Sequence, residues 1–179
     1  MRPVPSARRL LIAILLAVMA VPATAQAACR GADVPLSVSS LAQARHAVLC
    51  LHNNVRRTHG LRRLRENASL DRAARRHSRQ MVRQGYFDHR SPAGSTLVSR
   101  ARAAGYLRSA FAYTLGENIG WGEGELSTPR SMMRAWMLSP GHRANILRVG
   151  FRDLGIGLVA GTPVGTGGGT FTSDFGARS

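Results

Sequence analysis

The sequence lacks the short motifs that most directly identify a chemistry. It contains no HExxH zinc helix, no G-x-S-x-G nucleophile elbow and no glycine-rich phosphate loop after a strand. Its two cysteines are too few and too badly placed for a zinc ribbon. The commonest sequence signatures of zinc proteases, serine hydrolases and phosphate-loop proteins are therefore absent.

Acidic residues are also scarce, and lysine is missing altogether. The chain has 25 basic residues, all arginine, against 9 acidic ones, and its formal net charge is +16. The missing lysine is most simply a composition bias. A protein of this charge associates with anionic polymers or membrane surfaces in a salt-sensitive way. We expect anionic cell-envelope polymers or lipids as partners. No specific nucleic acid is expected, because aromatic interleaving and any docking motif are absent.

The first residues are typical of a secretory signal peptide. Three arginines precede an apolar run over residues 10–21, and Ala25-Gln26-Ala27 fits the small-x-small cleavage rule. A membrane anchor is the alternative, but the run is shorter than the roughly 18 residues that span a bilayer. We predict a signal peptide over residues 1–27 and a secreted protein, extracellular or periplasmic, with no transmembrane segment after cleavage. Cleavage removes three arginines and no acid, which leaves a net charge of +13.

Both cysteines, Cys29 and Cys50, follow the predicted cleavage site. Export would bring them into an oxidising compartment, where pairing is the default. We predict a Cys29–Cys50 disulfide that ties the mature N-terminus to the first helix and stabilises the fold by about 3 kcal/mol. Two unpaired thiols are the alternative.

Apolar spacing predicts helices first and strands last. A lead-in over residues 28–43 precedes the domain, residues 44–179. Helical periodicity, caps and stop signals predict helices over about 41–58, 67–85, 95–105 and 128–138. Residues 116–124 look irregular, and strands at 154–158 and 170–175 are joined by a glycine turn over 165–169. Helices followed by a terminal hairpin indicate the α+β class.

Three polar residues lie in apolar or glycine-rich surroundings. They are His89, Glu117 and His142. Glu117 should have a partner if it is buried, because an unpaired buried charge is costly. Spacing alone does not bring the three together, and each could be a locally bonded loop residue.

Five motifs in order resemble the CAP superfamily (cysteine-rich secretory, antigen 5 and pathogenesis-related proteins), and most of all its compact bacterial branch. They span about residues 44–176. The motifs are Leu51-His52-Asn53-Asn54-Val55-Arg56, Phe87-Asp88-His89, Gly116-Glu117-Asn118-Ile119, Trp136 with Ser139-Pro140-Gly141-His142-Arg143-Ala144-Asn145-Ile146-Leu147, and Phe171-Thr172-Ser173-Asp174-Phe175-Gly176. The resemblance implies a three-layer α-β-α sandwich with a central antiparallel sheet, to which the glycine-rich middle segment also contributes a strand.

The resemblance also implies a cleft with two histidines and two acids. His89, His142 and Glu117 match three of these positions, while Ser139 stands at the fourth. Such a triad suits zinc or another divalent metal with an open coordination position. A metal-free network that knits the cleft together is the competing interpretation. No catalytic residue is assigned beyond these three, and no cofactor is certain.

Three functions remain open at this level. We favour a secreted, non-enzymatic CAP protein. The alternatives are a hydrolase that uses the triad with Ser91 or Ser139, and a lipid- or sterol-binding module. Outside the triad, His77 is interpreted as a packed core residue. The arginines on one face of the second predicted helix form either a solvated face or a docking surface for anionic envelope material; they are Arg72, Arg75, Arg76, Arg79 and Arg83.

Overall fold

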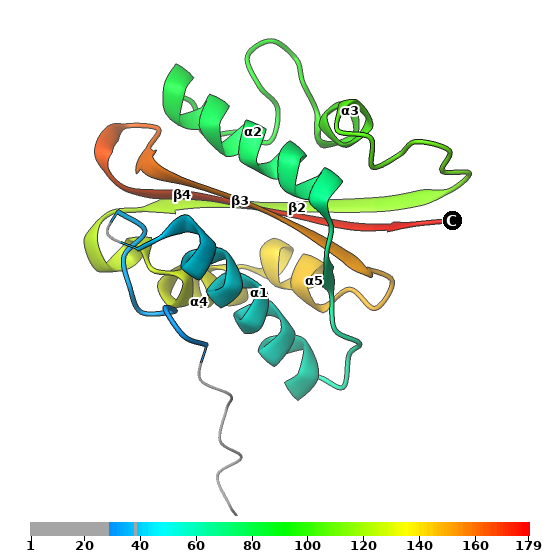
Figure 1. Ribbon diagram of the computed structural model, residues 1–179, viewed down its shortest axis with the longest axis horizontal. Coiled ribbons are helices and arrows are strands. Elements are labelled where there is room, and N and C mark those ends of the chain that lie inside the picture. The colour runs from blue at the N-terminus through cyan, green and yellow to red at the C-terminus, as the bar shows by residue number, and fades with distance from the viewer. Residues whose placement is uncertain (1–28, 38) are drawn as a thin grey trace, which may run out of the picture.

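The fold has three layers, with one sheet between two layers of helices (Figure 1). The computed structural model describes residues 29–37 and 39–179, so the predicted signal peptide lies outside the described residues. One face of the sheet is covered by α2 (Ala68–Gln84) and α3 (Leu97–Ala103). The other face is covered by α1 (Leu41–Thr58), α4 (Pro129–Leu138) and α5 (Pro140–Leu147). The predicted α-β-α sandwich of the α+β class is confirmed.

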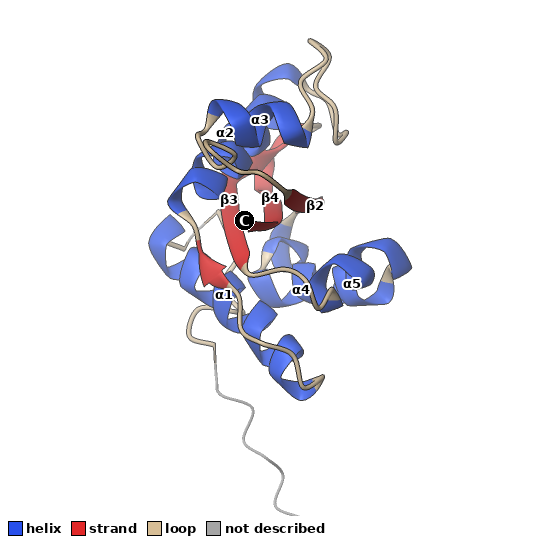
Figure 2. Cartoon of the chain, turned by 90° about the vertical axis from the view of Figure 1, so that its right-hand side faces the viewer, coloured by secondary structure: helices blue, strands red, loops and turns tan. Residues whose placement is uncertain are grey.

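The sheet places its C-terminal strand in the interior. Its order is β1-β3-β4-β2. The strands are β1 (Arg65–Glu66), β2 (Tyr113–Gly122), β3 (Asp153–Thr162) and β4 (Gly165–Arg178). The three long strands are antiparallel, and the two residues of β1 add a short parallel pairing to β3. β2 is therefore an edge strand, and Figure 2 shows it between the two helical layers.

Three segments differ from the hydrophobic pattern. β2 occupies the glycine-rich region that the pattern left irregular, as the CAP resemblance implied. The pattern does not predict helix α5, because Pro140 indicates only a stop for α4. Proline is favoured at a first helical position, and Ser139 serves as the last cap of α4 and the first cap of α5. The predicted turn over 165–169 is wrong, since β4 already begins at Gly165.

Helix α2 lies unusually close to the sheet. An added Cβ at Gly157 would come within 2.2 Å of the Ala74 backbone, and one at Gly155 within 2.3 Å of the Leu70 backbone. These two glycines of β3 therefore let the helix pack directly on the strand. The predicted end signals of α2 are confirmed: Asn67 caps its start, and Gly85 ends it in the left-handed conformation at φ 63°.

The opposite layer holds the larger core and the predicted covalent link. The Cys29–Cys50 disulfide is present and joins the lead-in to α1. Arg56 is fully buried and donates to the carbonyls of Ile146 at 2.8 Å and Arg148 at 3.0 Å, so it holds the end of α5 against α1. Among the helices of the described residues, none is long and apolar enough to cross a membrane.

Candidate functional site

The site lies at the β2 edge of the sheet, where both helical layers can contribute. Successive residues of a strand point to opposite faces. Glu117 accordingly contacts the α2–α3 layer, while Asn118 contacts the α5 side. The edge position of β2 lets loops from the two layers approach each other without crossing the sheet.

Both carboxylate oxygens of Glu117 are taken by cationic partners. The side chain is 3% exposed. Its Oε1 lies 2.8 Å from Nδ1 of His89, in the loop after α2. Its Oε2 accepts from Nη2 of Arg100, on α3, at 2.5 Å. The structure thus brings His89 and Glu117 together and adds Arg100.

Arg100 also holds the loop that carries His89. Its Nη1 donates to the backbone carbonyls of His89 at 3.0 Å and Ser95 at 3.2 Å. The side chain is buried, so these acceptors and Glu117 compensate the cost of removing its positive charge from water. Sequence reasoning did not single out Arg100, because no short motif marks an arginine whose partner lies 17 positions away.

The pKa values of the group follow from these contacts. Burial alone would raise the pKa of Glu117, but the hydrogen bond with His89 and the charge of Arg100 hold it below its usual value. The same hydrogen bond raises the pKa of His89. Glu117 is therefore an ionised, weakly basic carboxylate at neutral pH, and the half-exposed His89 is readily protonated beside it.

Two buried groups lie next to Glu117 that the sequence does not mark as part of the site. Asp174 is fully buried on β4, directly opposite Glu117 in the strand pairing. No donor group of another residue reaches its carboxyl oxygens, and a hydrogen bond between the two carboxyl groups requires a proton on Asp174. Burial, followed by the charge of Glu117, raises the pKa of Asp174 well above its ordinary value. His77 is fully buried, as predicted, and its Nε2 lies 3.9 Å from Oε2 of Glu117. Burial lowers the pKa of His77 to about 4.

His142 approaches from the other layer. Helix α5 is attached to β2 by asparagines: Asn145 donates to the Glu117 carbonyl at 3.1 Å and to Oδ1 of Asn118 at 2.9 Å, and Asn118 donates to the His142 carbonyl at 3.0 Å. The motifs around Glu117 and His142 are thereby linked physically. Burial lowers the pKa of His142, and the charge of His89 lowers it further.

An apolar groove of about 370 Å³ lies beside this network. His142 and Ser139 contribute polar atoms to it. Trp136 forms part of its wall and donates from Nε1 to the Ile119 carbonyl at 3.0 Å. Its lining consists of Phe87, Ile119, Gly120, Trp121, Leu126, Ser131, Met132, Ala135, Trp136, Ser139 and His142.

The carboxylate of Glu117 is engaged by protein side chains in this structure. Within residues 29–37 and 39–179, no group of three or more His, Cys, Asp or Glu side chains is placed to hold a metal ion. At Glu117, His89 and Arg100 each occupy one carboxylate oxygen. Zinc binding by His89, Glu117 and His142 remains a prediction from the sequence.

Comparison with known proteins identifies the family of the chain. Residues 49–175 match the model of the cysteine-rich secretory protein family, CAP. The uncharacterized protein YkwD of Bacillus subtilis (strain 168) is 36% identical over 138 residues, which are 77% of this chain and 50% of YkwD. The chain thus spans about half the length of that relative.

Solved structures share the fold. An extracellular protein containing a SCP domain from Bacillus anthracis str. Ames superposes with a TM-score of 0.60 at 25% identity, over 76% of this chain and 43% of that one. An outer surface protein of Borrelia burgdorferi gives a TM-score of 0.66 over 79% of this chain and 97% of its own, and at 17% identity it shows the fold alone. Together with the five ordered motifs, the family match establishes that the chain belongs to the CAP family of cysteine-rich secretory proteins.

Proposed function

We propose that this protein acts outside the cytoplasm as a non-enzymatic binding protein for an amphiphilic lipid, held in the apolar groove beside Glu117. The predicted signal peptide supports action outside the cytoplasm. The description of the similar Bacillus anthracis structure as an extracellular protein points the same way. Anionic envelope polymers or lipids are the partners that the net charge favours.

The apolar groove carries the proposal. Phe87, Trp121 and Leu126 line it and are 46%, 37% and 69% exposed. Large apolar side chains gathered in one concave place are typical of a ligand or partner site. A groove of about 370 Å³ is within the usual size for small ligands. His142 and Ser139 offer hydrogen bonds for a polar head group while the apolar lining covers a chain.

The state of Glu117 supports binding over turnover. A general base works best with a pKa near the working pH. The partners of Glu117 move its pKa the other way and occupy both of its oxygens. We therefore assign the Glu117 network the role of holding the His89 loop and helix α5 at the wall of the groove.

Intrinsic fluorescence tests the proposal directly, because both tryptophans of the chain line the groove. Titration with a lysophospholipid should change the emission in a saturable way. Replacing Leu126 by Gln removes apolar contact and should weaken binding by about tenfold or more. The matched control Leu138→Gln changes an 86% exposed leucine that does not line the groove, and it should bind as the parent does. No saturable change with lysophospholipid or with a sterol would rule the proposal out.

The competing functions need their own measurements on the same protein. Elemental analysis and zinc titration, beside His89→Ala and His142→Ala, test the metal site. Stoichiometric zinc lost in both variants would contradict the metal-free network. Peptide or ester hydrolysis that disappears in His142→Ala would favour the hydrolase, whereas activity that survives this change would exclude the site.

A further inference from the structure

The exposed face of α2 carries unpaired positive charge. Five arginines, Arg72, Arg75, Arg76, Arg79 and Arg83, are exposed there, and none forms an ion pair within the described residues. All nine acidic residues of the chain lie in the described part, since residues 1–28 and 38 contain none. Asp71, the one acid of α2, is turned inward to Arg45 and the Ile156 amide.

Repulsion among the arginines on the exposed face of α2 destabilises the helix in the free protein. Like charges three or four positions apart on a helix destabilise it by about 0.2–0.5 kcal/mol per pair. Arg72, Arg76, Arg79 and Arg83 follow one another along a single side of α2, one per turn, so their Cα atoms are on average about 5.4 Å apart along the helix axis. We call these four residues the arginine stripe. A bound anion would relieve the repulsion along it.

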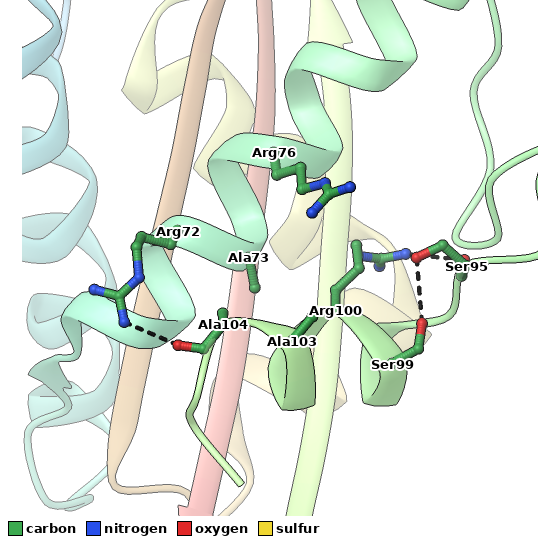
Figure 3. A pocket seen from close by; sticks show the side chains of 8 residues that line it. All are labelled: Arg72, Ala73, Arg76, Ser95, Ser99, Arg100, Ala103 and Ala104. Carbon is green, nitrogen blue, oxygen red and sulfur yellow. Dashed lines mark hydrogen bonds between the residues drawn. The ribbon is translucent and has the colours of Figure 1, made fainter. Parts of the chain in front are cut away.

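Two adjoining grooves run beside the arginine stripe. One, of about 560 Å³, is bordered by all four of its residues together with Arg75. The other, of about 390 Å³, lies between α2 and α3 and is shown in Figure 3. Arg72 and Arg76 line both, so the two grooves are continuous along α2. We call the second one the α2–α3 groove.

One residue that lines the α2–α3 groove has a buried donor without an acceptor. Arg100 lines it, with a side chain that is 2% exposed. The two terminal nitrogens of Arg100 are bonded to Glu117 and to loop carbonyls, but its Nε has no hydrogen-bond partner. An unsatisfied buried N–H costs about 1–3 kcal/mol. The hydroxyls of Ser95 and Ser99 stand in the same groove, with their oxygens 3.2 Å apart (Figure 3).

We propose that the α2–α3 groove seats one phosphate group of a linear polyanion, whose following phosphates lie along the arginine stripe. The guanidinium of Arg76, the Nε–H of Arg100 and the hydroxyl of Ser95 are the donors for the seated phosphate, whereas the Ser99 hydroxyl already donates to the Thr96 carbonyl in the cap of α3. Tetrahedral phosphate offers several oxygens to such converging donors, and arginine binds it in a bidentate way. This site is separate from the apolar groove and does not depend on a lipid ligand there.

The character of the grooves favours a polymer chain over a bilayer. Apart from small alanines, the lining of both grooves is polar or charged. A helix that lies in a membrane interface presents large apolar side chains beside its basic ones. The exposed face of α2 has none among the residues that line the grooves.

Polyphosphate is the probe for the test, titrated into the purified protein at several salt concentrations. Arg76→Gln/Arg79→Gln should weaken binding by about tenfold or more at about 0.15 M salt and lower the salt slope by about two. The control pair Arg62→Gln/Arg63→Gln removes the same charge from exposed positions between α1 and β1, outside both grooves, and should leave both quantities nearly unchanged. Equal weakening by the two pairs would overturn the proposal, because binding would then follow net charge alone.

A neutral variant separates a seated phosphate from diffuse attraction. Ser95→Ala changes no charge and should weaken polyphosphate binding by about threefold or more. Unchanged affinity in this variant would show that no phosphate is seated in the α2–α3 groove. Anionic phospholipid vesicles provide the last arm: binding to vesicles as tight as to polyphosphate, per phosphate, would assign the surface to membranes and refute the polymer.

Discussion

At the scale of single residues, the carboxyl group of Asp174 makes the stability of the fold depend on pH. It is fully buried, is reached by no donor group of another residue and lies across the β2–β4 pairing from the ionised Glu117. Burial and that neighbouring charge both favour its neutral form. The protein thus keeps one acid of its central strand protonated while the next strand carries a carboxylate bound by Arg100.

Replacing Asp174 by Asn should stabilise the protein at neutral and alkaline pH. In the unfolded chain an Asp ionises near about 3.9, whereas in the fold its pKa is raised. The wild type therefore loses stability as pH rises from about 4 towards the folded pKa, by about 1.4 kcal/mol for each pH unit. Asn has nearly the same shape and does not titrate. Urea unfolding at pH 8 and pH 4 should show the variant ahead at pH 8 and level with the wild type at pH 4.

The control for this comparison is Glu125→Gln, which alters an exposed carboxylate away from Asp174 and Glu117. It should change stability little at either pH. An Asp174→Asn variant that is less stable than the wild type at pH 8 would mean that the carboxyl group is ionised and paired in the fold.

At the scale of elements, the contact between α2 and β3 sets the shape of the site. Glycines at 155 and 157 let the helix backbone approach the strand, and this fixes where His77 and the loop of His89 stand relative to Glu117. The second attachment is the pair Asn118 and Asn145, which ties α5 to β2. The candidate site is therefore a product of two helix–strand contacts, one on each face of the sheet.

Gly157→Ala tests the closer contact. The new methyl group would meet the Ala74 backbone at 2.2 Å, which only a shift of α2 can relieve. We expect the free energy of unfolding to fall by about 3 kcal/mol, at the upper end of overpacking costs, as measured by urea denaturation. Gly150→Ala is the matched control, since nothing lies within 4 Å of its added methyl group. Similar stability of the two variants would disprove this account of the packing.

At the scale of the whole molecule, one disulfide fastens the lead-in to the sandwich. Cys29 and Cys50 are 21 positions apart, and Cys29 belongs to the main apolar core with α1, α4 and the sheet. The layers themselves are joined by buried apolar contacts and by the network around Glu117. The disulfide therefore adds stability to a domain that already has a substantial core.

Reduction should lower stability without unfolding the protein at room temperature. Closing a loop of this length contributes about 3 kcal/mol in the chain-entropy model. Urea unfolding with and without dithiothreitol measures the difference. In a Cys29→Ser/Cys50→Ser protein the reductant should have no effect, which controls for other actions of the reagent. A reduced protein as stable as the oxidised one would show that the link adds nothing.

Local chemistry in the sequence determined the parts of the structure that depend on neighbouring residues. The caps of α2, the proline start of α4, the predicted disulfide and the order of the CAP motifs could all be recognised from the sequence. The family resemblance also pointed to His89 and Glu117, which the structure places 2.8 Å apart. Helix α5 escaped prediction because Pro140 can either end one helix or begin the next.

Tertiary packing decided the chemistry of the cleft. Glu117 acquires its partner Arg100 from another element, and Asp174 becomes a buried neutral acid only because β4 lies inside the sheet next to β2. The apolar groove and the α2–α3 groove likewise combine residues that are far apart in the chain. Hydrophobic periodicity and caps report interactions within a few residues, whereas burial, charge pairing and pKa depend on which elements meet. That is why the sequence indicated the family and its fold, and only the folded chain showed which oxygens of Glu117 are occupied.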